Sequence, residues 1–442
     1  MNKFLQTSCL LLLTLTIGAQ NIEFSPLSKY GWGDLQNVNN GVIQQMGGAS
    51  AGYVDYNTFN FENPASLGFL RMTDIEVGLH AKYKTVKDNQ NRTSKDWSGN
   101  LDHVALGVPL RNSINEILNK KPYKNYYGIA FGMKPYATTG YSFITDDSLA
   151  NIGDIQRRLD GSGSYNHVFG SFGYQRNNIA AGIQIGYIFG VQRFEQRLLF
   201  LQQFPGADNY LDDQASMRAL SVKLGSIYRW VLNQEAIKKD KSIKPQSVNF
   251  GAHVGLPTNA RFKSSSLHTT IYDVPNYEVD TVYYTDGQIS NSNLPFQISI
   301  GAYYNHKEKS GFSFDYKFEN WKNSKTLLQG NVSLANTNAV SLGYWYRPDI
   351  SGYGKFFERI NYRAGLHFQN DYREINGKNP IAWHATLGFG VPFVFQRQIS
   401  MVNLGFSYGE FSWTEALRQN YFAIHLAFSV LDNEWFLKRR YD

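Results

Sequence analysis

A chain of 442 residues would ordinarily divide into two or three soluble domains of roughly 100 to 200 residues each. This sequence instead combines 15% aromatic residues and 39 glycines with only 18% charged residues, a balance typical of strands that face lipid on one side and water on the other. The formal net charge of +7 comes from scattered basic residues, apart from short clusters at 238–244 and 438–440, which argues against nucleic-acid binding.

Residues 1–19 have the organisation of a secretory signal peptide. Lys3 supplies a positive charge, an apolar run follows from Cys9 to Ile17, and small residues precede a cleavage site before Gln20. The run is too short to cross about 30 Å of hydrocarbon as a helix. The only cysteine lies within this run and is removed with it, which excludes disulfides and thiolate sites from the exported chain.

A repeating alternation of apolar and polar residues begins at Thr73. Because successive side chains of a strand point to opposite faces, each alternating segment places one face against an apolar environment and the other against water. We count fourteen such strands, with apolar faces within 74–83, 104–110, 127–133, 168–174, 179–189, 220–230, 248–256, 296–304, 312–318, 340–346, 360–368, 381–391, 402–408 and 422–430.

Two architectures are compatible with this alternation, a soluble β-sandwich and a closed membrane barrel. Most of the strands are near the length of about 9 to 11 residues that crosses a bilayer obliquely, and aromatic residues lie near their ends. Their number is even, as in single-chain bacterial barrels. The sequence therefore predicts an all-β protein, a 14-stranded antiparallel transmembrane β-barrel in the bacterial outer membrane, in contact with outer-membrane lipid and lipopolysaccharide.

The expected organisation is a signal peptide at 1–19, an N-terminal extension and hatch at 20–70, the barrel at 71–431 and a periplasmic C-terminal tail at 432–442. With the hatch on the periplasmic side, alternate connections face outward and should be the long ones. We expect these outward loops at 85–100, 135–163, 203–215, 257–293, 322–337, 370–380 and 411–419.

The segment 47–70 is rich in small and aromatic residues and is the candidate hatch, or plug. Pro64 has a fixed φ and no N–H donor, so this turn suits a place where no hydrogen-bonded ladder is needed. The residues assigned to the hatch are Gly47, Gly48, Asn63, Pro64 and Ala65.

The sequence predicts no enzyme, no metal site and no cofactor. Residues 48–52 match the G-x-S-x-G pattern of a nucleophile elbow, but that elbow requires a strand–turn–helix, and no helical pattern follows. The nine histidines are scattered singly, without the spacing of a zinc site.

Charged residues of both signs fall on lumen-facing positions of the strands, which indicates an ion-pair network that holds the hatch. A fatty-acid carboxylate could also pair with an arginine in the lumen. The lumen positions singled out are Lys223, Arg229, Arg347, Arg363 and His384.

An apolar run interrupts the alternation at the outer end of the strand that contains 179–189. It consists of Leu198, Leu199, Phe200, Leu201 and Phe204. In a water-facing loop such a run is unfavourable unless something covers it. Two readings stay open: these residues capture a hydrophobic ligand, or they pack against the loop 257–293 through Ile271, Tyr272 and Val274.

Several short strings resemble the FadL family of outer-membrane transporters for long-chain fatty acids and other hydrophobic compounds. They are Gly47–Ser50 followed by Asn63–Leu67, Leu294-Pro295 opening a strand, the stretch from Asp315 to Trp321, and Leu342–Pro348. The resemblance implies a barrel whose hatch blocks a water channel, with ligand captured by outer loops, passed to a lumen site and released through the wall. Related barrels also serve as non-transporting parts of secretion or assembly machinery.

Two functions are therefore expected as alternatives. The first is passive uptake of hydrophobic, fatty-acid-like small molecules across the outer membrane. The second is a non-transporting structural or accessory barrel in an outer-membrane secretion or assembly complex, with protein partners in the outer membrane or periplasm. In the second case, residues 21–46 and 435–442 are expected in the periplasm as docking segments.

Overall fold

The computed structural model describes most of the chain between Phe24 and Asn433. The described ranges are 24–88, 92–111, 113–118, 123–149, 153–201, 207–240, 242–272, 278–325, 332–349, 354–375, 377–395, 398–413 and 417–433. The predicted signal peptide, nearly all of the predicted C-terminal tail, Phe204 and Val274 lie outside these ranges.

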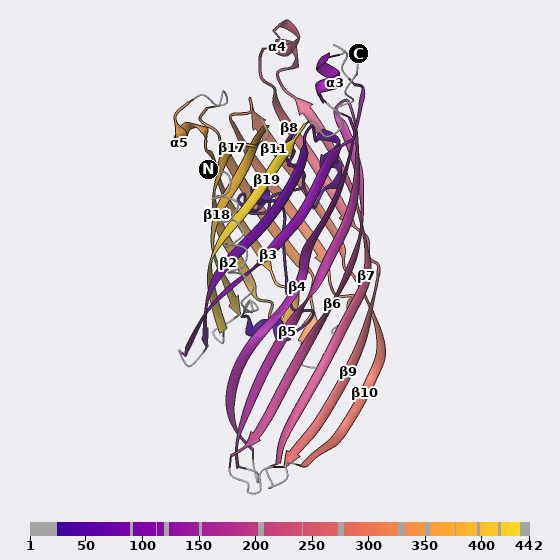
Figure 1. Ribbon diagram of the computed structural model, residues 1–442, viewed down its shortest axis with the longest axis vertical. Helices are drawn as coiled ribbons and strands as arrows, with labels where there is room; N and C mark the ends of the chain where they lie inside the picture. The colour runs from indigo at the N-terminus through magenta and orange to yellow at the C-terminus, as the bar shows by residue number, and fades with distance from the viewer. Residues whose placement is uncertain are drawn as a thin grey trace, which may run out of the picture.

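Long antiparallel strands form the wall of the barrel (Figure 1). They are β2 (Thr73–Asp88), β3 (Thr93–Pro109), β4 (Asn125–Leu149), β5 (Gly153–Arg176), β6 (Ile179–Phe200), β7 (Ala207–Val231), β8 (Gln246–Gly255), β9 (Asn259–Tyr272), β10 (Glu278–Asn293), β11 (Phe296–His306), β12 (Ser310–Asn320), β14 (Thr337–Tyr346), β15 (Asn361–Asn370), β17 (Ile381–Phe395), β18 (Gln398–Trp413) and β19 (Leu417–Asp432).

The barrel has fourteen strands because four of these elements form two interrupted strands. β8 continues into β9 past Pro257, and β10 continues into β11 past Pro295, since proline cannot donate to a ladder. β8 and β9, the two parts of one interrupted strand, both pair with β7. The last strand, β19, pairs with β2 from Asp432 opposite Thr73 to Leu417 opposite Asp88, which closes the barrel. The predicted 14-stranded antiparallel barrel is confirmed.

Side chains alternate across the wall as the sequence predicts. On β6, Ile183 and Ile185 are 38% and 52% exposed on the outer face, whereas Gln184 between them is 2% exposed and faces the lumen. An outer face of exposed apolar residues on a closed ladder suits a bilayer, because every backbone group is paired within the protein.

The remaining elements are short. They are η1 (Pro26–Lys29), β1 (Asp34–Leu35), α2 (Gly41–Gln44), η2 (Pro64–Phe69), α3 (Ser113–Leu118), α4 (Gln234–Lys239) and α5 (Phe356–Arg359), with a separate antiparallel pair of β13 (Val332–Leu334) and β16 (Arg373–Ile375). Among the described residues, no helix combines the length and the apolar character that crossing a membrane requires.

One end of the barrel carries the short turns, and the start of β2 and the end of β19 lie there too. The turn at Asn177-Asn178 joins β5 to β6, with Asn177 at φ 54°, a left-handed conformation that asparagine tolerates in tight hairpins. Lys307 and Glu308 have φ values of 52° and 59° in the equivalent turn of β11 and β12. Because bacterial barrels keep short turns on the periplasmic side, this is the periplasmic end.

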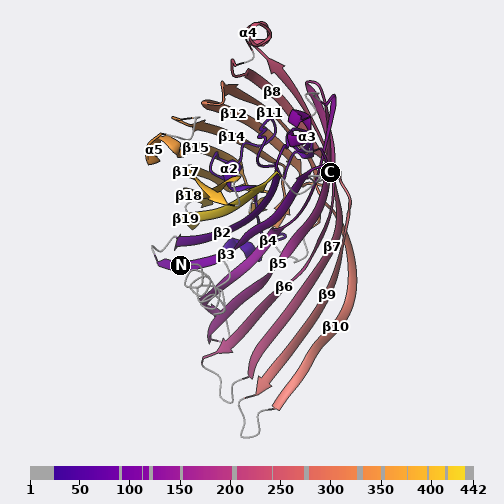
Figure 2. The ribbon, with the colours of Figure 1, turned by 45° about the horizontal axis from the view of Figure 1, so that its top comes forward.

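At the opposite, extracellular end, part of the wall extends far beyond the rest (Figures 1 and 2). We call this extension the extracellular sheet; its strands are the outer parts of β4, β5, β6, β7, β9 and β10. The expectation of loops at 85–100, 135–163, 203–215, 257–293 and 411–419 was wrong, because most of these residues form strands. Outside the membrane the outer face meets water, so the strands continue their ladder without an apolar face to mark them.

Residues 24–72, the luminal segment, lie inside the barrel wall. Gly182 of β6 and Gly251 of β8 allow this close approach: a Cβ at Gly182 would lie 2.4 Å from the carbonyl carbon of Pro64, and one at Gly251 would lie 1.9 Å from the oxygen of Ala51. The expectation that residues 21–46 dock in the periplasm was wrong for residues 24–46, which pack against the strands instead.

Candidate functional site

The candidate hatch residues make specific contacts with the wall. Gly47 adopts φ 66°, and its amide donates to Thr386 Oγ1 over 3.1 Å. Its Cα lies so close to the backbone of β15 that a side chain would clash with Leu366. Gly48, at φ 79°, lines the lumen cavity. This left-handed pair turns the chain at the end of α2, which explains the glycines at these positions.

A second turn of the luminal segment begins at Asn63. The Asn63 Oδ1 accepts from the amide of Ala65 over 3.1 Å and caps η2, while its Nδ2 donates to the carbonyl of Ala51 over 2.7 Å. Pro64 occupies the first position of η2, where no N–H is required. The five sequence-predicted hatch residues thus lie in two turns, which Asn63 ties together through the chain at Ala51.

Asp315 anchors the stretch that resembles a nucleophile elbow. Its Oδ2 accepts from the amides of Ser50 and Ala51, on the lumen side of β12. Ser50 is 5% exposed, and η2 begins only at Pro64. A carboxylate bonded to successive backbone amides fixes the turn, and the strand–turn–helix geometry of a nucleophile elbow is absent from this described stretch.

Glu62 bridges two lysines of the wall. Its two carboxylate oxygens each lie 2.5 Å from an ammonium nitrogen, one of Lys134 on β4 and one of Lys223 on β7. Lys134 also donates to the carbonyl of Val38 over 2.7 Å. All three side chains are at least four-fifths buried, so the charges depend on one another for compensation. Lys223, one of the lumen positions predicted from the sequence, therefore holds the luminal segment.

The other predicted lumen residues lie apart from one another. Arg363 donates to Gln45 Oε1 over 2.7 Å and to Asn403 Oδ1 over 2.8 Å. Near the periplasmic end, the Arg229 guanidinium lies 4.3 Å from the ring centre of Phe69. The structure thus places Arg363 and Arg229 against the luminal segment, and does not gather the predicted cations into one anion site.

Among the described residues, the last two predicted lumen residues make side-chain contacts with the wall. Arg347 Nε donates to Asn361 Oδ1 over 2.6 Å. The ring of His384 stacks on that of His367 at 4.7 Å. Neither contact involves the luminal segment.

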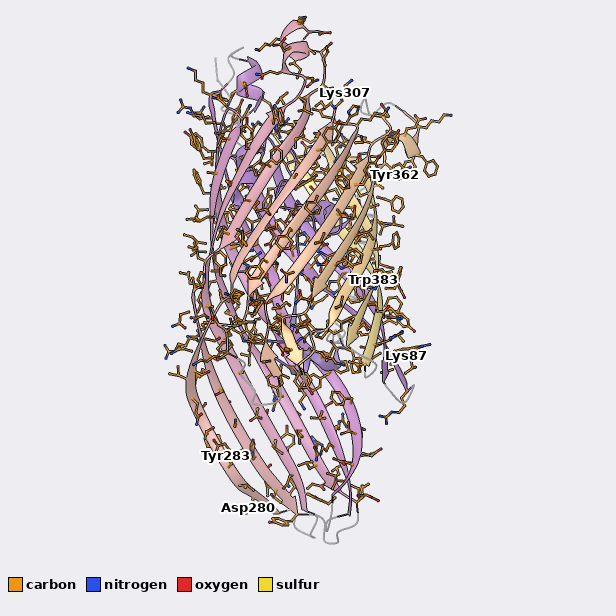
Figure 3. All side chains as sticks on the ribbon, turned by 180° about the vertical axis from the view of Figure 1, so that it is seen from behind. Lys87, Asp280, Tyr283, Lys307, Tyr362 and Trp383 are labelled. Carbon is orange, nitrogen blue, oxygen red and sulfur yellow. The ribbon has the colours of Figure 1, made fainter. Side chains whose placement is uncertain are left out.

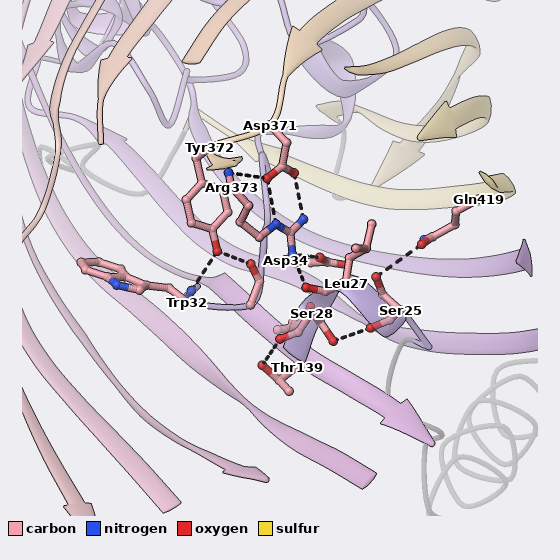
Figure 4. Close-up of polar contacts among 12 residues, drawn as sticks. Ser25, Leu27, Ser28, Trp32, Asp34, Thr139, Asp371, Tyr372, Arg373 and Gln419 are labelled. Atoms are coloured by element: carbon pink, nitrogen blue, oxygen red, sulfur yellow. Dashed lines mark hydrogen bonds and ion pairs between the residues drawn. The ribbon is translucent and has the colours of Figure 1, made fainter. Parts of the chain in front are cut away.

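An aromatic pocket at the extracellular side of the lumen encloses Trp32, which Figure 4 shows beside Tyr372. The indole is fully buried and meets Phe262 and Trp321 edge-on, with ring centres 5.3 and 5.2 Å away. Its Nε1 donates to the carbonyl of Lys325 over 2.9 Å. The pocket is thus filled by a residue of the protein's own amino-terminal segment.

Tyr372 and Arg373 hold this segment in place (Figure 4). The Tyr372 hydroxyl accepts from the amide of Trp32 over 2.8 Å and donates to the carbonyl of Gly33 over 2.6 Å. Burial raises the pKa of the Tyr372 phenol, which therefore keeps the proton that it donates. Arg373 pairs with Asp371 at 2.8 Å and with Asp34 at 2.9 Å.

These residues were missed in the sequence. Trp32, Tyr372 and Arg373 follow no strand periodicity and match no motif. A signal was nevertheless present, since a tryptophan in a non-strand segment upstream of the hatch needs an apolar partner.

A cavity of about 390 Å³ lies in the lumen alongside the luminal segment. Its lining mixes apolar residues with many ionisable ones, among them His80, Lys82, Asp102, Lys223, His253 and Lys317. Within the described part of the chain, no group of three His, Cys, Asp or Glu side chains is placed to hold a metal ion.

The apolar run at 198–201 lies at the far tip of the extracellular sheet. Leu198, Leu199 and Phe200 close β6 and are half-buried, and Leu201 is 60% exposed. The run pairs with β5 and β7 and is separated from Ile271 and Tyr272 by β7. The extracellular sheet therefore separates this run from the lumen cavity.

Comparison with solved structures places the fold. The Pseudomonas putida toluene transporter TodX matches at a TM-score of 0.57 and 16% identity, covering 89% of this chain and 98% of that chain. A Pseudomonas aeruginosa FadL homologue matches at 0.58 and 11% identity, with 89% and 99% covered. The CymD monoaromatic hydrocarbon channel matches at 0.52 and 15% identity, with 92% and 98% covered.

These likenesses confirm the FadL-type fold expected from the sequence, and the barrel is an outer-membrane protein of bacteria. No curated protein sequence matches the chain significantly. The family model described as BamG, however, matches residues 1–442. The chain belongs to the BamG family.

Proposed function

We propose that this barrel is a non-transporting accessory subunit of an outer-membrane assembly or secretion complex, and that it has no catalytic role. The carrying observation is that its own luminal segment fills the lumen from the extracellular side to the periplasmic end. Trp32 occupies the aromatic pocket, and Glu62 ties the segment to two strands of the wall, β4 through Lys134 and β7 through Lys223. The remaining cavity is lined by charged and imidazole groups, which an apolar cargo would have to desolvate.

The extracellular sheet supports the same proposal from the other side of the membrane. Six strands project into the medium, and a barrel that only conducts small molecules has no need of such a projection. A tall, exposed sheet suits contact with other proteins, because strand edges and exposed aromatic side chains are the groups that protein interfaces use.

Purification of the tagged native protein in mild detergent tests this proposal. We expect stoichiometric proteins to accompany the barrel, and mass spectrometry of the same sample should find no enriched apolar small molecule. A matched control is another tagged FadL-type barrel from the same cells. A monodisperse barrel without protein partners would contradict the accessory role.

Uptake of hydrophobic small molecules is the second candidate, and a specific observation favours it. The fold is that of solved structures described as a toluene transporter and as a monoaromatic hydrocarbon channel. In that case the cavity would take the molecule, and Leu198 to Leu201 would meet it outside.

Leu199→Asp provides the test of uptake. If the barrel transports, this variant should lose bound apolar compounds and the cells should take up a radiolabelled fatty acid more slowly. The control is Ile144→Asp, the same kind of change at an exposed position of β4 outside this run. Unchanged uptake in cells that lack the whole barrel would exclude this role.

A further inference from the structure

The outermost strand of the extracellular sheet is exposed on both faces and along one edge. β10 forms the margin of the sheet, where Figure 3 shows Asp280 and Tyr283 far from the barrel. Its apolar side chains are open to solvent: Val279 is 61% exposed, Val282 67%, Tyr284 65% and Ile289 55%. Because this part of the strand lies beyond the membrane, lipid tails do not cover these side chains.

The backbone of β10 is satisfied on one side only. Its register pairs run with β9, from Glu278 opposite Tyr272 to Asn293 opposite Asn259, and no other strand register involves β10 in the described ranges. The amide of Leu294 donates to the carbonyl of Thr258 in the chain that leads into β9. The backbone N–H and C=O groups of every second residue before Leu294 therefore point toward β9. The backbone groups of the residues in between point away from β9. The Asn293 carbonyl shows this, because it accepts a hydrogen bond from Ser324 Oγ. Within the described ranges, the amides and carbonyls of Asn291 and Ile289 therefore have no strand partner.

The usual protection of an edge strand is incomplete here. Natural edges carry lysine, proline or bulges that prevent pairing with other chains. β10 contains no Lys, Arg or Pro, and its charged residues, Glu278, Asp280 and Asp286, are all acidic. Its register with β9 shifts at 281–283 and 285–288, which divides the edge into short runs without covering it.

The opposite margin of the sheet already accepts an added strand. β1 pairs with β4, with Asp34 opposite Thr138 and Leu35 opposite Ala137, and the amide of Ser25 donates to the carbonyl of Gly140. The luminal segment thus covers the base of the β4 edge by strand addition. No described segment does this for β10 beyond its contact with Ser324 and Lys325.

A second copy of the barrel is a poor occupant of this edge. Two copies in one membrane are related by an axis along the membrane normal, so their β10 strands would tilt in opposite directions. Barrel strands tilt by about 35–45°, and the two edges would cross at roughly twice that angle, which prevents a continuous ladder. A flexible extended segment has no such restriction.

We propose, as a refinement of the accessory role above, that the β10 edge binds an extended segment of a partner protein as an added β-strand. The backbone of Ile289 and Asn291 supplies hydrogen bonds, and Tyr284 and Ile289 receive alternate apolar side chains of the segment. The acidic residues of β10 select a segment that carries Lys or Arg.

Photo-crosslinking in the native membrane locates the partner. A benzophenone amino acid replaces Tyr284 in one variant and Tyr210, on the interior strand β7, in the control. We expect a protein adduct from position 284 that is absent or much weaker at 210, with the crosslinked peptide containing basic and alternating apolar residues. An adduct with a second copy of the chain, with lipopolysaccharide, or equally at both positions would overturn the inference.

A pair of variants at one position separates backbone from side chain. Ile289→Pro removes an outward N–H that β9 does not use, whereas Ile289→Ala keeps it. We expect the proline variant to lose at least about tenfold of the crosslinked partner and the alanine variant to stay within about threefold. Both should keep the heat-modifiable migration of a folded barrel.

The outcomes also separate the two proposals. If the wild-type barrel retains its protein partners and Ile289→Pro retains them equally, the edge is not the binding site and the accessory role stands. If the wild-type barrel has no protein partner, the accessory role fails and the inference falls with it.

Discussion

At the scale of single residues, the buried charges of the lumen serve to hold the luminal segment. Glu62 lies between Lys134 and Lys223. In each ion pair the lysine nitrogen and the carboxylate oxygen are 2.5 Å apart, and the side chains have little exposure to water. Breaking a buried pair is expensive because it leaves an uncompensated charge, whereas an exposed pair contributes little. The Lys263–Asp286 pair of the extracellular sheet, with both side chains more than half exposed, provides the comparison.

Glu62→Gln should loosen the hatch without opening the barrel. The two lysines lose their shared carboxylate, and we expect local opening to become easier by about 3 kcal/mol, or roughly a hundredfold faster amide exchange at 59–66. Hydrogen exchange with mass spectrometry measures this. Lys263→Met is the control and should leave exchange in the hatch unchanged. Equal protection in wild type and Glu62→Gln would show that the pairs do not secure the segment.

Trp32→Ala should empty the aromatic pocket. Removal of a fully buried tryptophan costs about 3–5 kcal/mol, so residues 24–38 should become accessible to protease and exchange. An apolar cavity of this kind accepts a matching ring, and indole in the medium should restore part of the protection. Trp97, which is 54% exposed, gives the control variant Trp97→Ala. Protection of residues 24–38 that does not change in Trp32→Ala would contradict this account.

At the scale of elements, the luminal segment and the barrel wall are complementary surfaces. Glycines on the strands allow η2 and the chain near Ala51 to approach within contact of the wall backbone. Asp315 and Arg363 then bond the segment from β12 and β15. These contacts support the proposal that the segment closes the lumen to ions.

Deletion of residues 47–66 should raise the single-channel conductance of the barrel in planar bilayers. The deletion removes both turns of the hatch together with Glu62, and the closing ladder between β19 and β2 is left intact. Heat-modifiable electrophoresis verifies that the wall is folded. Conductance equal to that of the wild type would refute closure of the lumen by this segment.

At the scale of the whole molecule, the barrel and the extracellular sheet depend on different strand pairings. The barrel closes through β8 with β11 and β19 with β2, and the outer parts of β9 and β10 take no part in that closure. Gln288 pairs with Ser264, so the two strands can be joined at that level by a short turn.

Replacement of residues 265–287 by Asn-Gly should therefore leave a folded barrel. The type I′ turn favoured by this dipeptide suits the hairpin between Ser264 and Gln288, a pair in the hydrogen-bonded phase of the ladder. Circular dichroism and electrophoretic mobility should report a folded β-structure, while proteins that accompany the wild type should be lost. A shortened barrel that fails to fold would show that the extracellular sheet is needed for closure.

The sequence by itself determined the barrel. In a segment such as 179–189, isoleucine and tyrosine alternate with glycine and glutamine, and the length, aromatic ends and even number of such strands favoured a membrane barrel over a soluble sandwich. The turns at Gly47 and Asn63 were also readable, because glycine and the Asn-Pro pair have local conformational requirements. These features depend on neighbours in the chain.

Only the tertiary structure decided which residues fill the lumen and which edge of the extracellular sheet is unpaired. Trp32 meets Phe262, Trp321 and Tyr372, which lie more than two hundred residues further along the chain and are brought to it only by closure of the wall. The outer parts of the strands resembled loops, because beyond the membrane water contacts the outer face and no apolar periodicity remains. Which edge of that sheet lacks a partner depends on strand pairing, a property of the fold that no local pattern encodes.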